Sequence, residues 1–220
     1  MKYLVLAILV WNISSVLAQD SPESFEGVIT YSVEVEYPEN YKYGWYMDQK
    51  YGDTMLLFIS SNGDYLRTYI NTGDMGWDFT SYSHSENTVY AKWKNIDTVF
   101  WYPATDTSIQ LKTMNIGEDA LIMNQKCKSI FIESYFPLDS SNLSMSLYYS
   151  GYPKANPELY KNHKDSFYDL VYPMSKSHFL MMISDMGDFT ITYKAIAIEE
   201  VYWPSKLFKL PKDVPLKRWF

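Results

Sequence analysis

The most regular hydrophobic pattern of the chain runs from Val28 to Tyr37. Apolar or aromatic residues alternate there with polar ones: Ile29, Tyr31, Val33, Val35 and Tyr37 are separated by Thr30, Ser32, Glu34 and Glu36. Because successive side chains of a strand point to opposite faces, this pattern predicts a strand with one apolar and one wet face. An α-helix would scatter the same residues around its axis.

Similar runs recur along the chain and are bounded by turn residues. Asn62-Gly63 separates two of them, and this dipeptide between strand-like runs is the strongest local signal for a hairpin. The further predicted strands are 55–60, 64–70, 78–82, 88–94, 98–102, 125–133, 144–149, 178–183 and 188–201. The pattern therefore predicts a mainly β protein with roughly nine or ten strands in meander order, forming one antiparallel sheet or barrel.

Helix signals are few. Asn156-Pro157-Glu158 combines a capping side chain, a proline for the first turn and an early acidic residue, which predicts a short helix over 156–163. The segment 41–53 is expected to be partly helical, although Gly44 and Gly52 weaken that interpretation. No repeat or linker divides residues 19–220, so we expect a single β-rich domain there.

The first eighteen residues have the order of a secretory signal peptide. A positive start at Lys2 precedes the apolar stretch 3–11, and small or uncharged residues lead to Ala18. That stretch is shorter than the about 20 residues that a membrane-spanning helix needs. Cleavage after Ala18 predicts a periplasmic or secreted protein. No cysteine follows the cleavage point to carry a lipid, so we do not expect a lipoprotein.

The composition argues against two classes of binding partner and indicates one candidate binding surface, an aromatic groove. The formal net charge of −7 disfavours nucleic acid and anionic lipid surfaces. The 21 Tyr, 11 Phe and 7 Trp residues suit half-buried strands and wet grooves, because Tyr and Trp have an apolar body and a polar tip. The residues that could line such a groove are Trp45, Trp77, Trp93, Trp101, Tyr102, Tyr148, Tyr149, Met181, Met182 and Met186. Each of them could equally be a core or cross-strand residue.

The residues that usually bind metals or act as thiol nucleophiles are isolated. His84, His163 and His178 have no second His or Cys three to five residues away, so we interpret them as turn or surface residues and expect no metal site. Cys127 alternates with Lys126 and Lys128, which predicts a small buried side chain on a strand. An intermolecular disulfide is the alternative if the thiol is exposed.

No other motif points to a reaction. There is no Gly-x-Ser-x-Gly turn and no glycine-rich phosphate loop. The adjacent carboxylates at 118–119 and 199–200 would face opposite sides of a strand and cannot converge by local geometry. We therefore expect no catalytic, cofactor-binding or metal-binding residues, and a protein that is not an enzyme.

Three segments carry a resemblance to a known group: Phe25 to Tyr31, Lys126-Cys-Lys128, and Phe189 to Glu199 followed by Ser205 to Pro211. They resemble exported proteins of unknown function from Gram-negative envelopes, which are similar in fold to the LolA/LolB lipoprotein carriers. The resemblance implies a strongly curved antiparallel sheet, an open half-barrel, with a short helical lid over an apolar cavity.

These observations lead to two expectations about function. The first is a non-catalytic extracytoplasmic protein that binds an apolar ligand, an acyl chain or a lipoprotein, in the half-barrel groove. The alternative is an envelope interaction or structural module that docks another protein through a sheet edge or an aromatic face. In a eukaryotic host, Asn142-Leu-Ser144 would be a glycosylation site.

Overall fold

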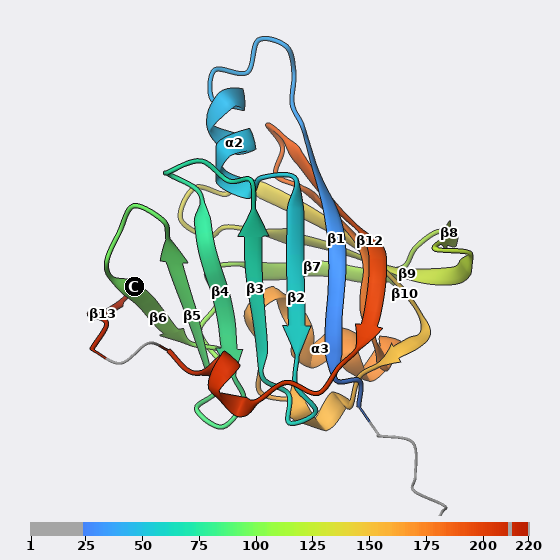
Figure 1. The fold of residues 1–220 in the computed structure, drawn as a ribbon. Coiled ribbons are helices and arrows are strands. Elements are labelled where there is room, and N and C mark those ends of the chain that lie inside the picture. Colours follow the sequence, from blue (N-terminus) through green and yellow to red (C-terminus); the bar gives the residue numbers. More distant parts are fainter. Residues whose placement is uncertain (1–23, 211–212, 220) are drawn as a thin grey trace, which may run out of the picture.

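The computed structural model describes residues 24–210 and 213–219, which form a large sheet with short helices at its ends (Figure 1). The predicted signal peptide, residues 1–18, lies outside the described residues. The strands are β1 (Gly27–Glu36), β2 (Thr54–Ile59), β3 (Tyr65–Ile70), β4 (Trp77–Ser83), β5 (Thr88–Trp93), β6 (Val99–Pro103), β7 (Gln110–Ile116), β8 (Ala120–Ile122), β9 (Gln125–Tyr135), β10 (Asn142–Lys154), β11 (Ser177–Asp185), β12 (Thr190–Glu200) and β13 (Leu216–Arg218).

The strand order is β13-β6-β5-β4-β3-β2-β1-β12-β11-β10-β9-β7, with β8 paired to β9. The predicted meander is confirmed within two runs, β1 to β6 and β9 to β12. These runs are joined through the pairing of β1 with β12, not through β6 and β7, which lie at opposite ends of the order. All neighbours are antiparallel except β13, which lies parallel to β6.

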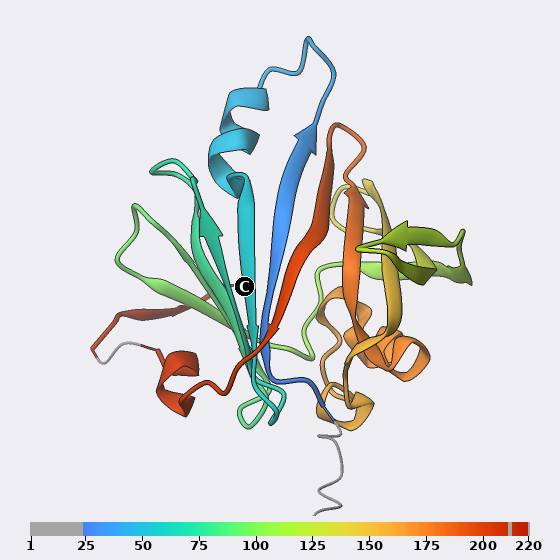
Figure 2. The ribbon, with the colours of Figure 1, turned by 45° about the vertical axis from the view of Figure 1, so that its right-hand side comes forward.

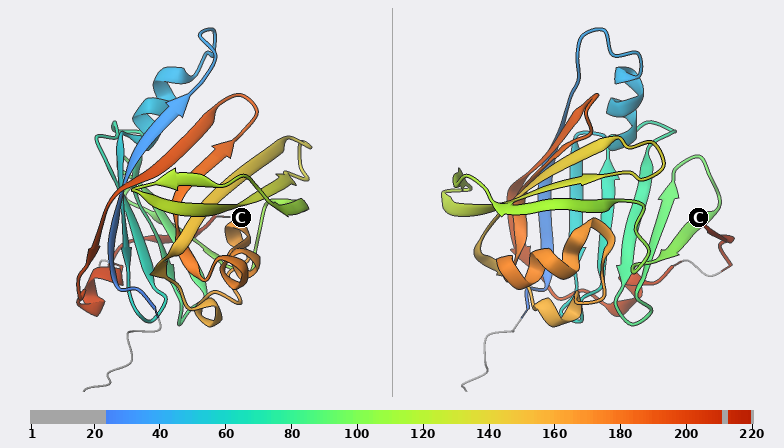
Figure 3. Two further views of the ribbon diagram at one scale, coloured as in Figure 1. Left: turned by 90° about the vertical axis from the view of Figure 1, so that its right-hand side faces the viewer. Right: turned by 180° about the vertical axis from the view of Figure 1, so that it is seen from behind.

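The sheet is strongly curved and stays open. Its two end strands in the described residues, β13 and β7, do not pair with each other. Figures 2 and 3 show two halves, β1 to β6 and β7 to β12, that diverge from the β1–β12 seam at a steep angle. The predicted mainly β, curved antiparallel sheet is thus confirmed. Its concave surface is the inner face.

The helices lie at the ends of the inner face. The α2 helix (Gly44–Tyr51) falls within the segment expected to be partly helical. The predicted helix at 156–163 is wrong in extent: only the 3₁₀ turn η1 (Pro157–Leu159) forms, with the Asn156 side chain accepting a hydrogen bond from the Glu158 backbone at 3.1 Å. A second 3₁₀ turn, η2 (Asp165–Phe167), leads into α3 (Tyr168–Ser175), and η3 (Ser205–Phe208) precedes β13.

The sequence pattern did not predict α3, because Pro173 lies inside it and is a residue that usually ends helices. Its side chains at 168, 171, 172 and 175 are buried, and they face β10, β11 and the turn η1. Packing of this apolar face therefore stabilises the helix against its poor propensity. Seen from behind, α3 covers one end of the inner face (Figure 3).

The core lies between the two halves of the sheet. In β1 the predicted alternation is confirmed: Ile29 and Tyr31 are completely buried, while Glu34 and Glu36 are exposed. Buried residues of both halves and of α3 belong to one hydrophobic cluster. The fold therefore encloses its apolar side chains by bending one sheet, with the helical segment closing one end.

Candidate ligand-binding site on the inner face

The inner face of β3 carries an arginine between two tyrosines. Because side chains alternate along the strand, Tyr65, Arg67 and Tyr69 share this face, and both tyrosines are buried. Register places Tyr65 opposite Tyr82 and Arg67 opposite Thr80 on β4. A permanently charged side chain therefore lies in a face that is otherwise mostly aromatic or apolar.

The Arg67 guanidinium has few partners for its depth. Its Nη2 donates a hydrogen bond to the Tyr168 hydroxyl, the side chain also hydrogen-bonds the Tyr69 hydroxyl, and the group lies 4.9 Å from the centre of the Tyr65 ring. The Nε atom is buried without a hydrogen-bond partner, and no ion pair joins Arg67 to a carboxylate of the described residues. The residue as a whole is half-buried. Arg67 thus keeps one unused donor, the Nε, within the inner face.

Asp165, at the start of η2, is the carboxylate that acts on this arginine. Burial raises the pKa of Asp165, while Arg67 and a hydrogen bond from Tyr102 oppose that rise. The Tyr102 hydroxyl lies 3.3 Å from Asp165 Oδ2. We call Tyr65, Arg67, Tyr69, Asp165 and Tyr168 the arginine recess. Tyr102 joins the recess to its aromatic neighbours.

An aromatic cluster extends the inner face toward the β13 end. It consists of Trp77, Trp93, Phe100, Tyr102 and Trp219. The rings of Trp77 and Trp93 stack at 4.4 Å, and Trp219 meets Trp93 edge-on at 5.0 Å. Trp219 is 37% exposed, and the other four rings are half-buried. Part of this aromatic surface is therefore exposed to solvent.

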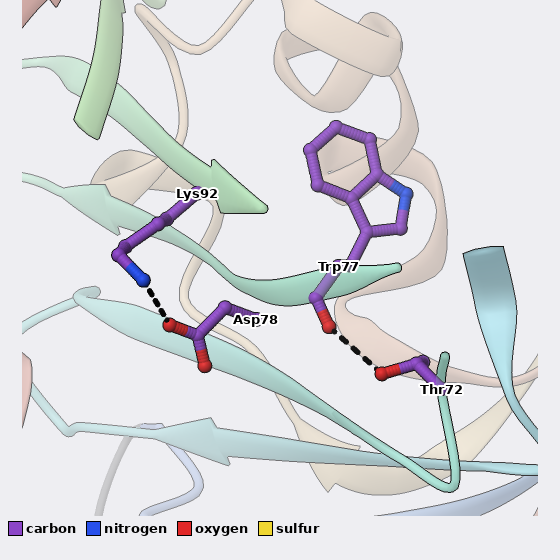
Figure 4. A network of polar contacts seen from close by, with 4 residues as sticks. All are labelled: Thr72, Trp77, Asp78 and Lys92. Atoms are coloured by element: carbon purple, nitrogen blue, oxygen red, sulfur yellow. Dashed lines mark hydrogen bonds and ion pairs between the residues drawn. The ribbon is translucent and has the colours of Figure 1, made fainter. Parts of the chain in front are cut away.

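A bulge at the start of β4 directs neighbouring side chains to opposite faces. Trp77 pairs with Trp93, but Phe79 pairs with Lys92, so the register shifts between them. In Figure 4 the Trp77 indole points away from Asp78, whose carboxylate binds Lys92 at 2.7 Å. The Thr72 hydroxyl donates to the Trp77 carbonyl at 3.3 Å and holds the turn before the strand. The bulge thus turns the indole inward and the ion pair outward.

Lys50 of α2 borders the aromatic cluster on its other side. Its ammonium lies over three rings, at 5.1 Å from Tyr51, 5.7 Å from Trp77 and 5.9 Å from Tyr46. Burial lowers the pKa of Lys50. Within the described part of the chain it forms no ion pair. The inner face of this half therefore holds two cations, Lys50 and Arg67, near aromatic rings.

The prediction that the histidines are turn or surface residues is wrong for two of them. His163 and His178 are 0% and 1% exposed. Each ring contacts a tyrosine hydroxyl at 3.1 Å: His163 Nε2 that of Tyr65, and His178 Nδ1 that of Tyr172. Burial lowers the pKa of each histidine to about 3, so both are neutral near pH 7. They became buried because α3 and its preceding turns fold over the inner face.

Two internal voids lie beneath the helical segment. One is lined by Tyr65, Arg67 and α3, and the other lies between α3 and β10. Their volumes are about 0 and 10 Å³, whereas a single water needs about 10–15 Å³. Neither void can hold an acyl chain. On the inner face, the surface left for a ligand is its open side, at the aromatic cluster. Hollows of about 340–440 Å³ lie elsewhere on the molecule, beside Asn142, Tyr152 and Pro157.

The structure gathers only some of the predicted groove residues. Trp77, Trp93 and Tyr102 lie together in the aromatic cluster. Trp101 faces the other side of the sheet, beneath Arg218. The remaining groove residues lie on α2 or along the other half of the sheet: Trp45, Tyr148, Tyr149, Met181, Met182 and Met186.

Elsewhere, one side-chain prediction is confirmed and several residues of the candidate site were not predicted. Cys127 is a free, buried thiol flanked by exposed lysines, as predicted. The arginine recess was missed, although the spacing of Arg67 from Tyr65 and Tyr69 already places the three on one face. Asp165 and Tyr168 had no local signal, because they reach the recess from a distant segment.

No protein-family model matches the sequence, and no curated protein is significantly similar to it. Among the described residues, no three His, Cys, Asp or Glu side chains are grouped so that they could hold a metal ion. Within residues 24–210 and 213–219, no helix has the length and apolar character needed to cross a bilayer.

Proposed function

We propose that this protein is a non-catalytic binding protein for an apolar ligand with an anionic group, such as a fatty acid. The ligand would lie on the inner face of β3 to β6, with its anionic group on Arg67. The observation that carries the proposal is the state of Arg67: charged, deep in the inner face, hydrogen-bonded to tyrosine hydroxyls rather than paired with a carboxylate, and left with an unpartnered Nε.

The charge of Arg67 favours an anionic partner. A charged group in a site of low polarity is costly unless it is paired and hydrogen-bonded. The Nε and adjacent Nη donors of a guanidinium match the two oxygens of a carboxylate, and the Arg67 Nε is unpartnered. A ligand carboxylate would supply the counter-ion that Asp165 does not supply as a direct ion pair.

The aromatic cluster supplies the apolar part of the proposed site. Each CH₂ group of a buried chain contributes about 0.8 kcal/mol, so a short contact with the rings of Trp93 and Trp219 is useful. Tyr102 lies between the rings and Asp165, which makes the two surfaces continuous. A ligand with an apolar body and an acidic end could therefore contact both at once.

The proposal includes the compartment and the family resemblance. We propose a periplasmic or secreted location because residues 1–18 have the order of a signal peptide. The open curved sheet with short helices at one end of its inner face supports a LolA/LolB-like carrier of an acyl chain or lipoprotein. Because the two voids under α3 are too small, the acyl chain would lie on the open side.

The test is a titration of the purified protein with sodium oleate, followed by tryptophan fluorescence. We expect saturable quenching or a shift, because three tryptophans lie in the aromatic cluster, and weaker binding of the uncharged ester methyl oleate. Arg67→Met should reduce oleate affinity about tenfold or more, the loss of about one charge-assisted contact. Arg218→Gln, on the opposite face, is the matched control.

Either of two results would refute this function. One is the absence of oleate binding by a folded protein. The other is equal affinity of the wild type and Arg67→Met for both oleate and its ester, which would show that no anionic group meets Arg67.

A second candidate function, an envelope interaction module, is favoured by the β7 end of the sheet. This strand ends the strand order, and Leu111, Ile116 and the nearby Leu121 are exposed. Exposed edges with apolar side chains pair readily with other chains. A photo-crosslinking residue at position 116, used in the native host, should give one discrete adduct. Absence of any adduct at this position would remove the candidate.

A further inference from the structure

The segment from Tyr37 to Tyr51 carries a second surface, separate from the inner face. It extends beyond the end of β1 and returns through α2, at the top of Figure 1. Tyr43 and Trp45 are 52% and 59% exposed, and Tyr41 and Tyr46 are half-buried. We call these four residues the aromatic tip.

The aromatic tip is held in place from below. The Tyr37 hydroxyl donates to Asp48 at 2.9 Å, and the Gly73 backbone donates to the Gln49 carbonyl at 2.9 Å. The Tyr41 ring packs against Phe189 of the loop between β11 and β12 at 6.0 Å. These contacts fix the segment, yet the outer rings are left in solvent. Large exposed aromatic side chains gathered in one place usually mark a contact surface.

The chemistry of the aromatic tip matches a bilayer surface. Tyr and Trp concentrate at membrane–water interfaces because their rings are apolar and their OH or NH groups stay hydrated. One exposed ring of each kind is present here. The contact would be peripheral and reversible, since two side chains bury little apolar area.

The charges around the aromatic tip select the kind of lipid. Glu36, Glu39 and Asp48 are exposed, and Asp188 acts electrostatically on Tyr41, against a single exposed lysine, Lys42, whose ammonium lies 5.6 Å from the centre of the Tyr43 ring. The carboxylates attract the outer ammonium group of a zwitterionic headgroup, and the exposed Trp45 ring can form a cation–π contact with it. The same carboxylates repel anionic headgroups. The surface therefore complements a neutral bilayer.

We propose that the aromatic tip docks the protein on zwitterionic lipid surfaces through Tyr43 and Trp45. This inference stands independently of the ligand proposed for Arg67. The Lys50 side chain of the same helix lies over Trp77, so docking would bring a bilayer next to the aromatic cluster.

The test is sedimentation with phosphatidylcholine vesicles, using full-length mature protein without added fatty acid. We expect part of the protein to pellet with lipid, and brominated lipid to quench Trp45. The double variant with Tyr43→Ser and Trp45→Ser should lower the partition coefficient about tenfold or more, the equivalent of losing one well-buried ring. Tyr202→Ser, which removes a tyrosine that is 82% exposed after β12, should leave it unchanged.

Anionic vesicles separate this mechanism from simple charge attraction. Phosphatidylglycerol vesicles should bind less protein than phosphatidylcholine vesicles at low salt, because of the carboxylates near the aromatic tip. The proposal is overturned if phosphatidylcholine vesicles leave the protein in the supernatant, or if the double variant binds as the wild type does. Since oleate binding is measured separately, failure here does not affect the function proposed for Arg67.

Discussion

On β9 and β10 the buried inner-face residues are aliphatic apart from Ser134: Ile130, Ile132, Leu143, Met145 and Leu147. On β3 the corresponding positions carry Tyr65, Arg67 and Tyr69, and the neighbouring strands add tryptophans. Both halves follow the same alternation and belong to one sheet. Strands β9 and β10 bury mostly side chains that need no partner, whereas β3 keeps a charge and two hydroxyls close to apolar surroundings.

This difference separates what stabilises the fold from what is available for binding. Aliphatic side chains gain free energy by burial alone. Arg67, by contrast, loses hydration and has no direct carboxylate partner in return, only the Tyr168 and Tyr69 hydroxyls and the Tyr65 ring. A residue that costs stability without contributing to packing is expected where a ligand acts. The predictions below test whether different residues provide stability and binding.

The largest expected effect is acid destabilisation through the histidines under α3. Their pKa of about 3 in the fold lies below the ordinary value of 6.5, so the unfolded chain binds more protons as the pH falls below 6.5. Stability is thus complete above that value and is lost progressively toward pH 3. Between pH 6.5 and 4.5 the loss is about 2–3 kcal/mol per histidine. Asp165 opposes it, because its raised pKa favours proton uptake by the fold.

Urea unfolding at pH 7, 5.5 and 4.5 measures this loss. His178→Phe should flatten the pH dependence by about the contribution of one histidine, again about 2–3 kcal/mol over that range. An identical pH dependence in wild type and variant would contradict the buried neutral state of His178.

The next effect is a cavity in the aliphatic half. Ile132→Ala should lower the free energy of unfolding by about 2–5 kcal/mol, because Ile132 is completely buried and its neighbours cannot fill the space. Oleate affinity should not change. Chemical denaturation and the fluorescence titration measure the two quantities. A large loss of affinity in the folded variant would mean that the halves do not divide stability from binding.

Arg67→Met should have the opposite effect to Ile132→Ala: it should lower oleate affinity and leave stability nearly unchanged. Without ligand, the free energy of unfolding should stay within about 1 kcal/mol of the wild type or increase, since an apolar side chain replaces an incompletely paired charge. Tyr168 loses a hydrogen-bond donor but can keep its ring in place. Destabilisation as large as that of Ile132→Ala would show that Arg67 is a structural residue.

The smallest effect is expected on the outer face. Arg218 pairs with Asp106 at 3.0 Å, and both side chains are substantially exposed. Arg218→Gln should therefore change the free energy of unfolding by about 0.2–1 kcal/mol at most. A clearly larger loss would indicate that the β13–β6 pairing, and with it the position of Trp219, depends on this contact.

The sequence predicted the fold correctly where a segment has regular polar–apolar alternation or a clear turn motif. The alternation in β1 and the Asn62-Gly63 turn identified strands and a hairpin correctly. The pairing of β1 with β12 could not be predicted, because strands that are distant in the chain leave no local signal. β7 was missed for another reason: most of its residues are exposed, so it lacks the pattern of a half-buried strand.

The candidate site was only partly predictable. Composition indicated aromatic surface, and three of the named residues do lie together. The position of Arg67 on the face of Tyr65 and Tyr69 follows from spacing, but its incomplete pairing does not. That property depends on Asp165 and Tyr168, which a left-handed turn at Ser166 and Phe167 brings over the inner face.

The most direct test of the central claim is an NMR titration that observes the Nε–Hε signal of Arg67. We predict that oleate moves this signal downfield as the unpartnered Nε donates to a carboxylate, and that methyl oleate does not. A signal unaffected by saturating oleate, or oleate perturbations confined to β9 and β10, would contradict the account.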